Sequence, residues 1–175
     1  MKIAPPIDTD FGFYNNYIYK IKDKDLITAL HDNWTEIKAM ADGLTKDELS
    51  YRYDTGKWSI KEVFVHLVDA ERNFAYRIMR ASRGDQGILP AYNIHDFILN
   101  AHADQRSMAN IMQELELLRK TTITMFEGIH PDMLDKTSPA RDVMVSVRAF
   151  GFCIAGHAVH HMEVIRKKYL VAVSG

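Results

Sequence analysis

The chain contains a single cysteine, Cys153, so no disulfide bond can form within it. The absence of disulfide bonds is typical of proteins in a reducing compartment, so we expect a cytoplasmic location. No apolar stretch approaches the roughly 20 residues that a membrane-spanning helix needs, and the N-terminus lacks the apolar core of a signal peptide. The sequence therefore predicts a protein without disulfides and without a membrane-spanning segment.

Charge of either sign is also not in excess, because 22 Lys and Arg residues stand against 23 Asp and Glu residues. The formal net charge is -1 when histidine is counted as neutral. Proteins that bind nucleic acid or a membrane surface usually carry a clear excess of positive charge. We therefore expect neither nucleic acid nor a membrane among the partners of this chain.

Strand patterns are almost absent, and Val143-Met144-Val145 is the only short candidate. Apolar residues instead recur at spacings of three and four, which is typical of amphipathic helices. In the second of these helices, Ser59 and Glu62 have the spacing of a capping box, and Gly84 closes the segment. The periodic segments cover residues 27–44, 59–84, about 104–127 and 146–169.

Irregular segments are predicted between these helices. Residues 1–22 mix proline, glycine and tyrosine and indicate an extended lead-in, while 85–101 and the segment around Pro139 indicate long connections. Four helices of similar length predict an all-α fold, a four-helix bundle, in a single domain over residues 1–175. Connections too long for tight hairpins predict an order other than up-down-up-down, and they could cover one end of a cavity.

Three of the eight histidines lie within residues 157–161. An α-helix turns by about 100° per residue, so His157 and His161 share one face, a turn apart. They lie on an apolar stripe, whereas His160 lies on a more polar side. Two imidazoles at this spacing can bind one transition-metal ion. The same spacing also occurs in surface pairs and in hydrogen-bonded core pairs, so spacing alone leaves both interpretations open.

A third ligand must come from elsewhere, and His66 is the best candidate. It lies in the middle of the second helix, at the edge of the apolar stripe, and facing helices of a bundle can bring side chains to a common point. Cys153 precedes His161 by eight residues, a rise of roughly 12 Å on a straight helix. Because metal–ligand bonds are only about 2.0 to 2.3 Å long, we expect Cys153 in the core instead.

Two separated segments carry a family resemblance. Residues 57–72 (KWSIKEVFVHLVDAER) resemble the second-helix signature of the DinB-like superfamily. Residues 146–150 (SVRAF) and 155–161 (AGHAVHH) resemble its fourth-helix signature. The two motifs agree in type, order and spacing, and the resemblance extends from about residue 26 to residue 169.

The resemblance implies a four-helix bundle of DinB-like type with a divalent metal ion held by His66, His157 and His161. It also implies that His160 is not a usual ligand. Zinc and nickel are the metals found in such proteins, and imidazole ligands suit either ion. Characterised relatives include S-transferases of low-molecular-weight thiols and a thiol-dependent isomerase, and family members are often dimers, so a homodimer is expected.

Two classes of function follow from a site of three histidines. An ion held by neutral imidazoles keeps its full charge, so it would lower the pKa of bound water or hold a thiol as its thiolate. The first gives a hydrolase and the second a thiol S-transferase, each acting on a small-molecule substrate. The alternative is a non-catalytic metal-binding bundle with a structural or ligand-sensing role, which a closed coordination sphere would favour.

Residues around the ligands complete the prediction. Ligand imidazoles usually donate their second N–H to a carboxylate or carbonyl. Asp69, three residues after His66, is the candidate catalytic residue for this role, although many helix carboxylates are simply solvated. Other candidates are Glu71, which also fits a surface pair with Arg72, Asn73, His31 and Asp96. We expect Trp34 and Trp58 in the core, His95, His102 and His130 in solvent, and a cavity lined by residues 85–101 and the start of the first helix.

Overall fold

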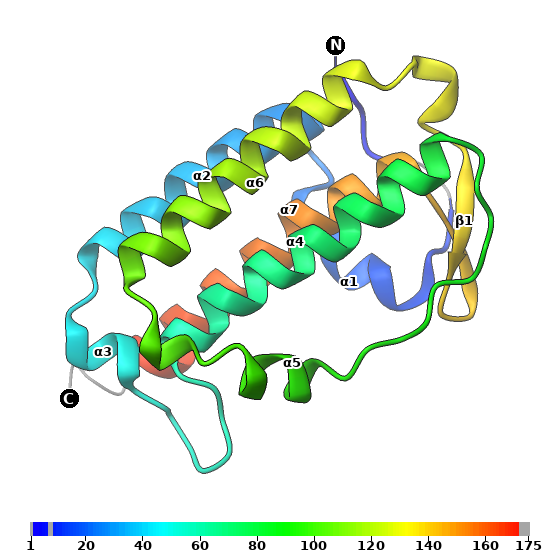
Figure 1. The fold of residues 1–175 in the computed structure, drawn as a ribbon. Coiled ribbons are helices and arrows are strands. Elements are labelled where there is room, and N and C mark those ends of the chain that lie inside the picture. The colour runs from blue at the N-terminus through cyan, green and yellow to red at the C-terminus, as the bar shows by residue number, and fades with distance from the viewer. Residues whose placement is uncertain (1, 7–8, 172–175) are drawn as a thin grey trace.

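Four long helices form the body of the molecule in the computed structural model, which describes residues 2–6 and 9–171 (Figure 1). Within these residues, the helices are α2 (Leu26–Gly43), α4 (Ile60–Ser82), α6 (Met108–Gly128) and α7 (Val147–Val164), and α7 continues into a π-helical turn over Ile165–Leu170. The predicted all-α four-helix bundle is confirmed. None of the described helices combines the length and the apolar character that crossing a membrane requires.

The order of the helices around the bundle differs from their order in the sequence. Helices α2 and α4 each make extensive contacts with both α6 and α7, so α2 and α4 lie on one diagonal of the bundle. In Figure 1, α4 and α6 run in the same direction, antiparallel to α2 and α7. The connection between α4 and α6 must therefore return along the length of the bundle, and the predicted departure from up-down-up-down order is confirmed.

Side-chain caps define where the two helices that carry the histidines begin. Ser59 accepts a hydrogen bond from the amide of Glu62, and the Glu62 carboxylate accepts one from the amide of Ser59. This is the predicted capping box, and it starts α4 at Ile60. Ser146 starts α7 in the same way by accepting a hydrogen bond from the amide of Ala149.

Other boundaries differ from the prediction. Ser107 accepts a hydrogen bond from the amide of Asn110, so α6 begins at Met108 rather than near Asp104. The connection over 85–101 is not wholly irregular, because it contains α5 (Ile94–Asn100). A further short helix, α3 (Lys46–Ser50), precedes α4. These short helices lack a long apolar period, which is why the sequence pattern did not indicate them.

A two-stranded hairpin joins α6 to α7. Strand β1 (Thr137–Ala140) pairs antiparallel with β2 (Val143–Ser146), with Ala140 opposite Val143. The strand candidate around Val143 is therefore confirmed. The register leaves a two-residue turn, and its first residue, Arg141, has a positive φ of 52°.

The prediction of an extended lead-in over residues 1–22 is wrong for most of its C-terminal half. Residues 12–21 form three consecutive helical turns: η1 (Gly12–Tyr14), α1 (Asn15–Ile18) and η2 (Tyr19–Ile21). Tyr14 and Ile18 are buried, and α1 packs against α7. Isolated single turns are unstable in water, so packing on α7 maintains them. Positions 1, 7 and 8 lie outside the described residues.

Glycine at position 156 makes this packing possible. A Cβ atom there would lie 2.0 Å from the carbonyl oxygen of Tyr17 and 2.5 Å from its carbonyl carbon. No real Cβ atom approaches backbone so closely. The backbone of α1 therefore rests directly on α7, one residue before His157.

The core contains a buried ion pair where a surface pair was predicted. Glu71 does not pair with Arg72; its carboxylate accepts hydrogen bonds from Arg119, with Nη2 and Oε2 2.8 Å apart. A further Arg119 nitrogen donates to the carbonyl oxygen of Leu30 at 2.8 Å. Both charged side chains are 3% exposed. Arg72 pairs with Glu114 at the surface instead. The pair therefore ties α4 to α6 and α2 within the core.

Candidate metal centre

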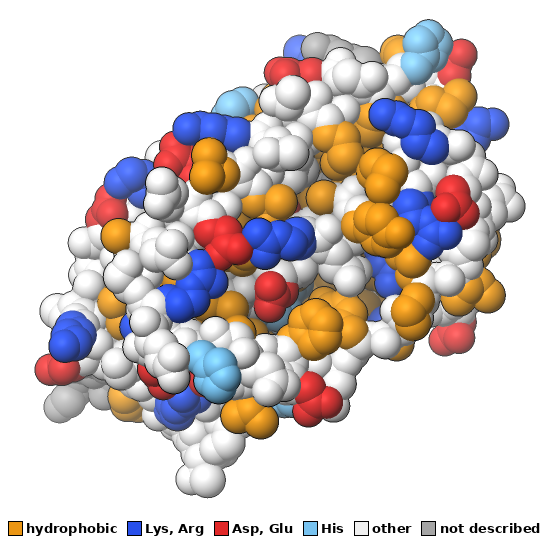
Figure 2. Space-filling model, in the orientation of Figure 1, with side chains coloured by type: hydrophobic (Ala, Val, Ile, Leu, Met, Phe, Trp, Pro, Cys, Tyr) orange, Lys and Arg blue, Asp and Glu red, His pale blue; other side chains and the backbone are white. Residues whose placement is uncertain are grey.

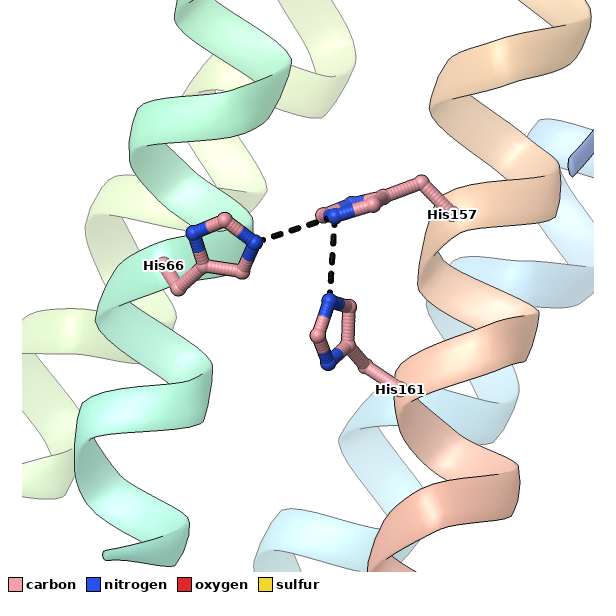
Figure 3. A group of neighbouring side chains, drawn as sticks. All are labelled: His66, His157 and His161. Atoms are coloured by element: carbon pink, nitrogen blue, oxygen red, sulfur yellow. Dashed lines mark hydrogen bonds between the residues drawn. The ribbon is translucent and has the colours of Figure 1, made fainter. Parts of the chain in front are cut away.

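Three histidine side chains converge between α4 and α7. Figure 3 shows His66 projecting from α4 toward His157 and His161, which project from α7. The Nε2 atom of His157 lies 3.0 Å from the Nε2 atom of His66 and 3.0 Å from that of His161. One ligand atom from each ring lies within 4.8 Å of the other two. The convergence of these three rings, predicted as a ligand set, is observed.

Local structure explains why these positions meet. His157 and His161 are one turn apart on α7, so their rings lie on the same face of the helix and meet edge to face. Val65 and Leu67 anchor the middle of α4 in the core on either side of His66. Because α4 and α7 pack along much of their length, the His66 ring meets the two rings of α7.

Burial keeps the three imidazoles neutral. His66 and His157 are 5% and 6% exposed, and His161 is partly buried. Desolvation lowers the pKa of His66 to about 4 and that of His161 to about 3. Burial also lowers the pKa of His157 well below its usual value. At neutral pH each ring therefore has one nitrogen with a free lone pair, which is the form that binds a metal ion.

The donor set fits a metal ion better than it fits a hydrogen-bond network. A neutral imidazole nitrogen either donates one hydrogen or accepts at one lone pair. The Nε2 atom of His157 faces two other Nε2 atoms, so hydrogen bonds cannot satisfy all three rings equally. A cation accepts all three lone pairs at once. Nitrogens bound to one tetrahedral zinc ion are about 3.3 Å apart, given bonds of about 2.0 to 2.1 Å, close to the distances observed.

The neighbouring histidine and cysteine stay outside this group, as predicted. Within the described residues, the metal-compatible cluster consists of the three histidines alone. The His160 ring is half-buried, with its centroid 5.1 Å from that of His161. Cys153 is fully buried in the core, and burial raises the pKa of its thiol.

A cavity of about 450 Å³ opens beside the three rings. As predicted, part of its wall comes from the connection after α4, at Ile88, Leu89, Ala91, Tyr92 and Ile94. The start of α2 was also expected to line the cavity, but Phe13, Tyr14 and Tyr17 line it instead. In Figure 2, hydrophobic side chains gather on the face where α4 and this connection run. The histidines therefore border an aromatic cavity that a small molecule can enter.

Two aromatic side chains pack against the ligand candidates. The Trp58 ring, expected in the core, is only partly buried, lines the cavity and lies 5.0 Å from the ring of His66 between centroids. The Tyr17 ring lies 5.1 Å from that of His157, edge to face. Trp34, also expected in the core, is likewise partly buried, and both tryptophans pack against the core. The two cavity rings restrict how the imidazoles can rotate.

The candidate partners of the ligand imidazoles occupy different environments. Asp69 is half-buried, and burial raises the pKa of its carboxyl group. Among the described residues, no hydrogen bond joins Asp69 to the three rings, so its role remains a prediction. Asn73 lines the cavity, where its Oδ1 accepts a hydrogen bond from Arg77.

His31 and Asp96 are exposed and do not line the cavity, so the expectation that they are partners of the ligand imidazoles is wrong. His95, His102 and His130 are exposed, as predicted.

Several residues of the cavity were not predicted from the sequence. Arg77 could have been found, because His66, Ala70, Asn73 and Arg77 follow one another at spacings of four, three and four on one face of α4. Tyr17 and Arg141 gave no such signal. They reach the cavity from a short helix and from a hairpin turn, which only the tertiary structure brings together.

Comparisons with known proteins agree with the observed fold. A sequence model of the DinB superfamily matches residues 29–165. The chain is similar in structure to YfiT from Bacillus subtilis, with a TM-score of 0.74 and 14% sequence identity over 95% of this chain and 93% of that one. YfiT is described as a probable metal-dependent hydrolase with an unusual four-helix bundle topology. A comparison with curated proteins gives no match.

Proposed function

The chain belongs to the DinB superfamily, and on that premise we propose that it is a divalent-metal-dependent enzyme acting on a small-molecule substrate. In this proposal His66, His157 and His161 hold the ion, and the enzyme uses water or a low-molecular-weight thiol as the nucleophile. It is then either a hydrolase or a thiol S-transferase. The description of YfiT as a probable metal-dependent hydrolase is consistent with the first of these.

One observation supports this proposal above all others. Three neutral imidazoles direct their Nε2 atoms at one another on the wall of a cavity of about 450 Å³. Catalytic zinc sites commonly have three protein ligands and an open fourth position, whereas structural sites are closed by four. Within the described residues, the cluster has three members. The arrangement therefore favours a catalytic site.

The chain's own residues supply the setting for the reaction. A divalent ion bound by the three histidines supplies the positive charge that activates a nucleophile and stabilises developing negative charge. The imidazoles stay neutral because they are buried. Trp58 and Tyr17 hold two of the rings in place. The aromatic walls limit the amount of water around a bound substrate.

Metal content tests the ligand set directly. We expect the purified protein to contain about one divalent ion per chain by elemental analysis, and His161→Ala to contain far less because two imidazoles bind an ion weakly. The matched control is His160→Ala, which removes the adjacent ring outside the cluster. Undiminished metal in His161→Ala would contradict the proposal, and so would an equal loss in both variants.

An activity screen separates hydrolysis from thiol transfer. The metal-loaded protein is incubated with esters, amides and electrophilic acceptors, with and without small thiols. Product that carries the thiol identifies an S-transferase, while thiol-independent cleavage identifies a hydrolase. The His161→Ala variant is the control, because activity that it retains does not come from this site.

The rival function is a non-catalytic bundle in which the metal serves stability or ligand sensing. A purely structural ion is usually enclosed by four protein ligands, whereas this cluster borders a cavity, which disfavours the rival. Thermal unfolding with and without a chelator tests this rival. A large loss of stability on chelation, together with no turnover in the screen, would replace the enzymatic proposal with the structural one.

The proposal also includes the metal and the setting of the protein. We infer zinc or nickel as the ion, because imidazole nitrogens suit both, and elemental analysis of protein purified without added metal distinguishes them. A cytoplasmic homodimer is proposed from the family resemblance and from the single buried cysteine. Light scattering coupled to size-exclusion chromatography measures the oligomeric state, and a monomer would contradict this part.

A further inference from the structure

Two arginines line the cavity without a carboxylate partner among the described residues. Arg77, from α4, donates a hydrogen bond from its Nε to Asn73 Oδ1 at 3.0 Å. Arg141, from the turn between β1 and β2, has its guanidinium carbon 4.3 Å from the centre of the Phe13 ring. Burial raises the pKa of the Tyr14 hydroxyl, and the charges of Arg77 and Arg141 both oppose this rise; all three residues line the cavity, so the two guanidiniums border the same part of it. Of the eight other arginines, Arg83 contacts Ser82, and seven form ion pairs: Arg52, Arg72, Arg80, Arg106, Arg119, Arg148 and Arg166.

The rest of the lining carries no compensating negative charge. No Asp or Glu residue is among the cavity-lining residues described, and the three histidines are neutral. Burial raises the pKa of Tyr92, and the Asp69 carboxylate adds to this rise, so Asp69 lies near one wall, but it does not border the cavity. The cavity therefore has two cations, aromatic and aliphatic walls, and a net positive charge.

The backbone at Arg141 adds to this observation. A residue with φ of 52° in a two-residue hairpin turn is ordinarily Gly, Asn or Asp. Here the position holds a long cationic side chain that packs over Phe13 and borders the cavity. A guanidinium at this strained position is explained if the cavity needs a positive charge there.

We propose that the cavity binds a small organic anion, whose carboxylate or comparable anionic group lies between Arg77 and Arg141. Its apolar body lies against the aromatic wall, and its other end reaches the three histidines. The proposal rests on the proposed function, because it names the substrate class of the same site. A volume of about 450 Å³ accommodates such a molecule, and guanidinium groups match the geometry of a carboxylate.

Binding of matched probes tests the proposal. The probes are 3-phenylpropanoate and the uncharged 3-phenylpropanamide, which share an apolar body and differ in charge. The protein carries Trp34→Phe, so that fluorescence comes from Trp58 on the cavity wall. Titrations are made on the metal-loaded protein and after treatment with a chelator, because a carboxylate could also bind the metal itself.

The arginine variants give the decisive comparison. We expect the parent to bind the propanoate at least about tenfold more tightly than the amide, as charge-assisted hydrogen bonds predict. Arg77→Met and Arg141→Met should each reduce this preference, and the double variant should lose it while still binding the amide. The control is Arg83→Met, which removes an arginine that lies outside the cavity and contacts Ser82.

Several outcomes would overturn the proposal. They are the absence of binding by either probe, a preference that persists in the double variant, and a preference that chelation abolishes in the parent. The last result would assign the anion to the metal. Circular dichroism checks that each variant is folded, and the single variants remain informative if the double variant is not. A failure of the proposed function is distinguishable, because then His161→Ala keeps its metal whatever the arginine variants show.

Discussion

Replacing Gly156 with alanine tests whether α1 really rests on α7. The new Cβ atom would lie 2.0 Å from the Tyr17 carbonyl oxygen and 3.0 Å from its Cα. These atoms belong to backbone, so no change of side-chain rotamer relieves the overlap. Either α1 moves away by more than about 1 Å, or the packed helices strain to accommodate the methyl group.

The size of the effect follows from what α1 buries. Detaching α1 together with the preceding turn η1 exposes Tyr14 and Ile18, and each buried side chain of this size contributes about 1.5 to 3 kcal/mol. The loss is then about 3 to 6 kcal/mol. Alanine favours the helix over glycine by about 1 kcal/mol, which offsets part of it. We expect Gly156→Ala to reduce the free energy of unfolding by about 2 to 5 kcal/mol.

Urea denaturation followed by circular dichroism measures this difference. The matched control is Gly128→Ala at the last residue of α6, where a Cβ would meet nothing within 4 Å. We expect that variant to be unchanged or more stable by up to about 1 kcal/mol. If Gly156→Ala were as stable as the parent, the close approach of α1 to α7 would be refuted.

Three further predictions concern the core, a helix start and the histidines. Glu71→Ala leaves the Arg119 charge buried without a partner, so it should reduce the free energy of unfolding by about 3 to 5 kcal/mol, measured by thermal unfolding. Arg72→Ala, at an exposed pair, should reduce it by less than about 1 kcal/mol. Equal losses in the two variants would contradict the buried ion pair. Ser59→Ala removes the cap of α4 and should cost about 1 kcal/mol by urea titration, and no loss would show the cap to be dispensable. Burial lowers the pKa of the three histidines in the folded protein, so below pH about 6.5 the unfolded chain binds more protons than the folded one. The free energy of unfolding of the metal-free protein should therefore fall as the pH decreases from about 6.5 toward 4. The slope should be about 1.4 kcal/mol per pH unit for each histidine, measured by urea unfolding at several pH values, and a flat profile would mean that the rings protonate within the fold.

The long helices were predictable because each carries its own signals. The capping box at Ser59 and the apolar period that follows define α4 without help from the rest of the chain. The turns over 12–21 could not be predicted in this way, since a single helical turn is stable only when another part of the molecule covers it. Their partner, α7, lies more than a hundred residues away in the sequence.

The same distinction applies to the candidate site. The pairing of His157 with His161 follows from one helical turn, so the sequence was enough. His66 needed the assumption that two helices of a bundle face each other, or the family resemblance. Arg141 could not be identified at all, because its position beside the cavity depends on the packing of the hairpin against the N-terminal turns.

The contact between Tyr17 and Gly156 has a consequence for how the protein is made. The N-terminal turns leave the ribosome long before the helix that they cover, so their aromatic residues have no partner during most of translation. Contacts between such distant segments form late and slowly. The wall beside His157 is therefore completed only after synthesis of α7, and a stalled or truncated nascent chain that lacks α7 would display Phe13, Tyr14 and Tyr17 to chaperones instead of forming a cavity.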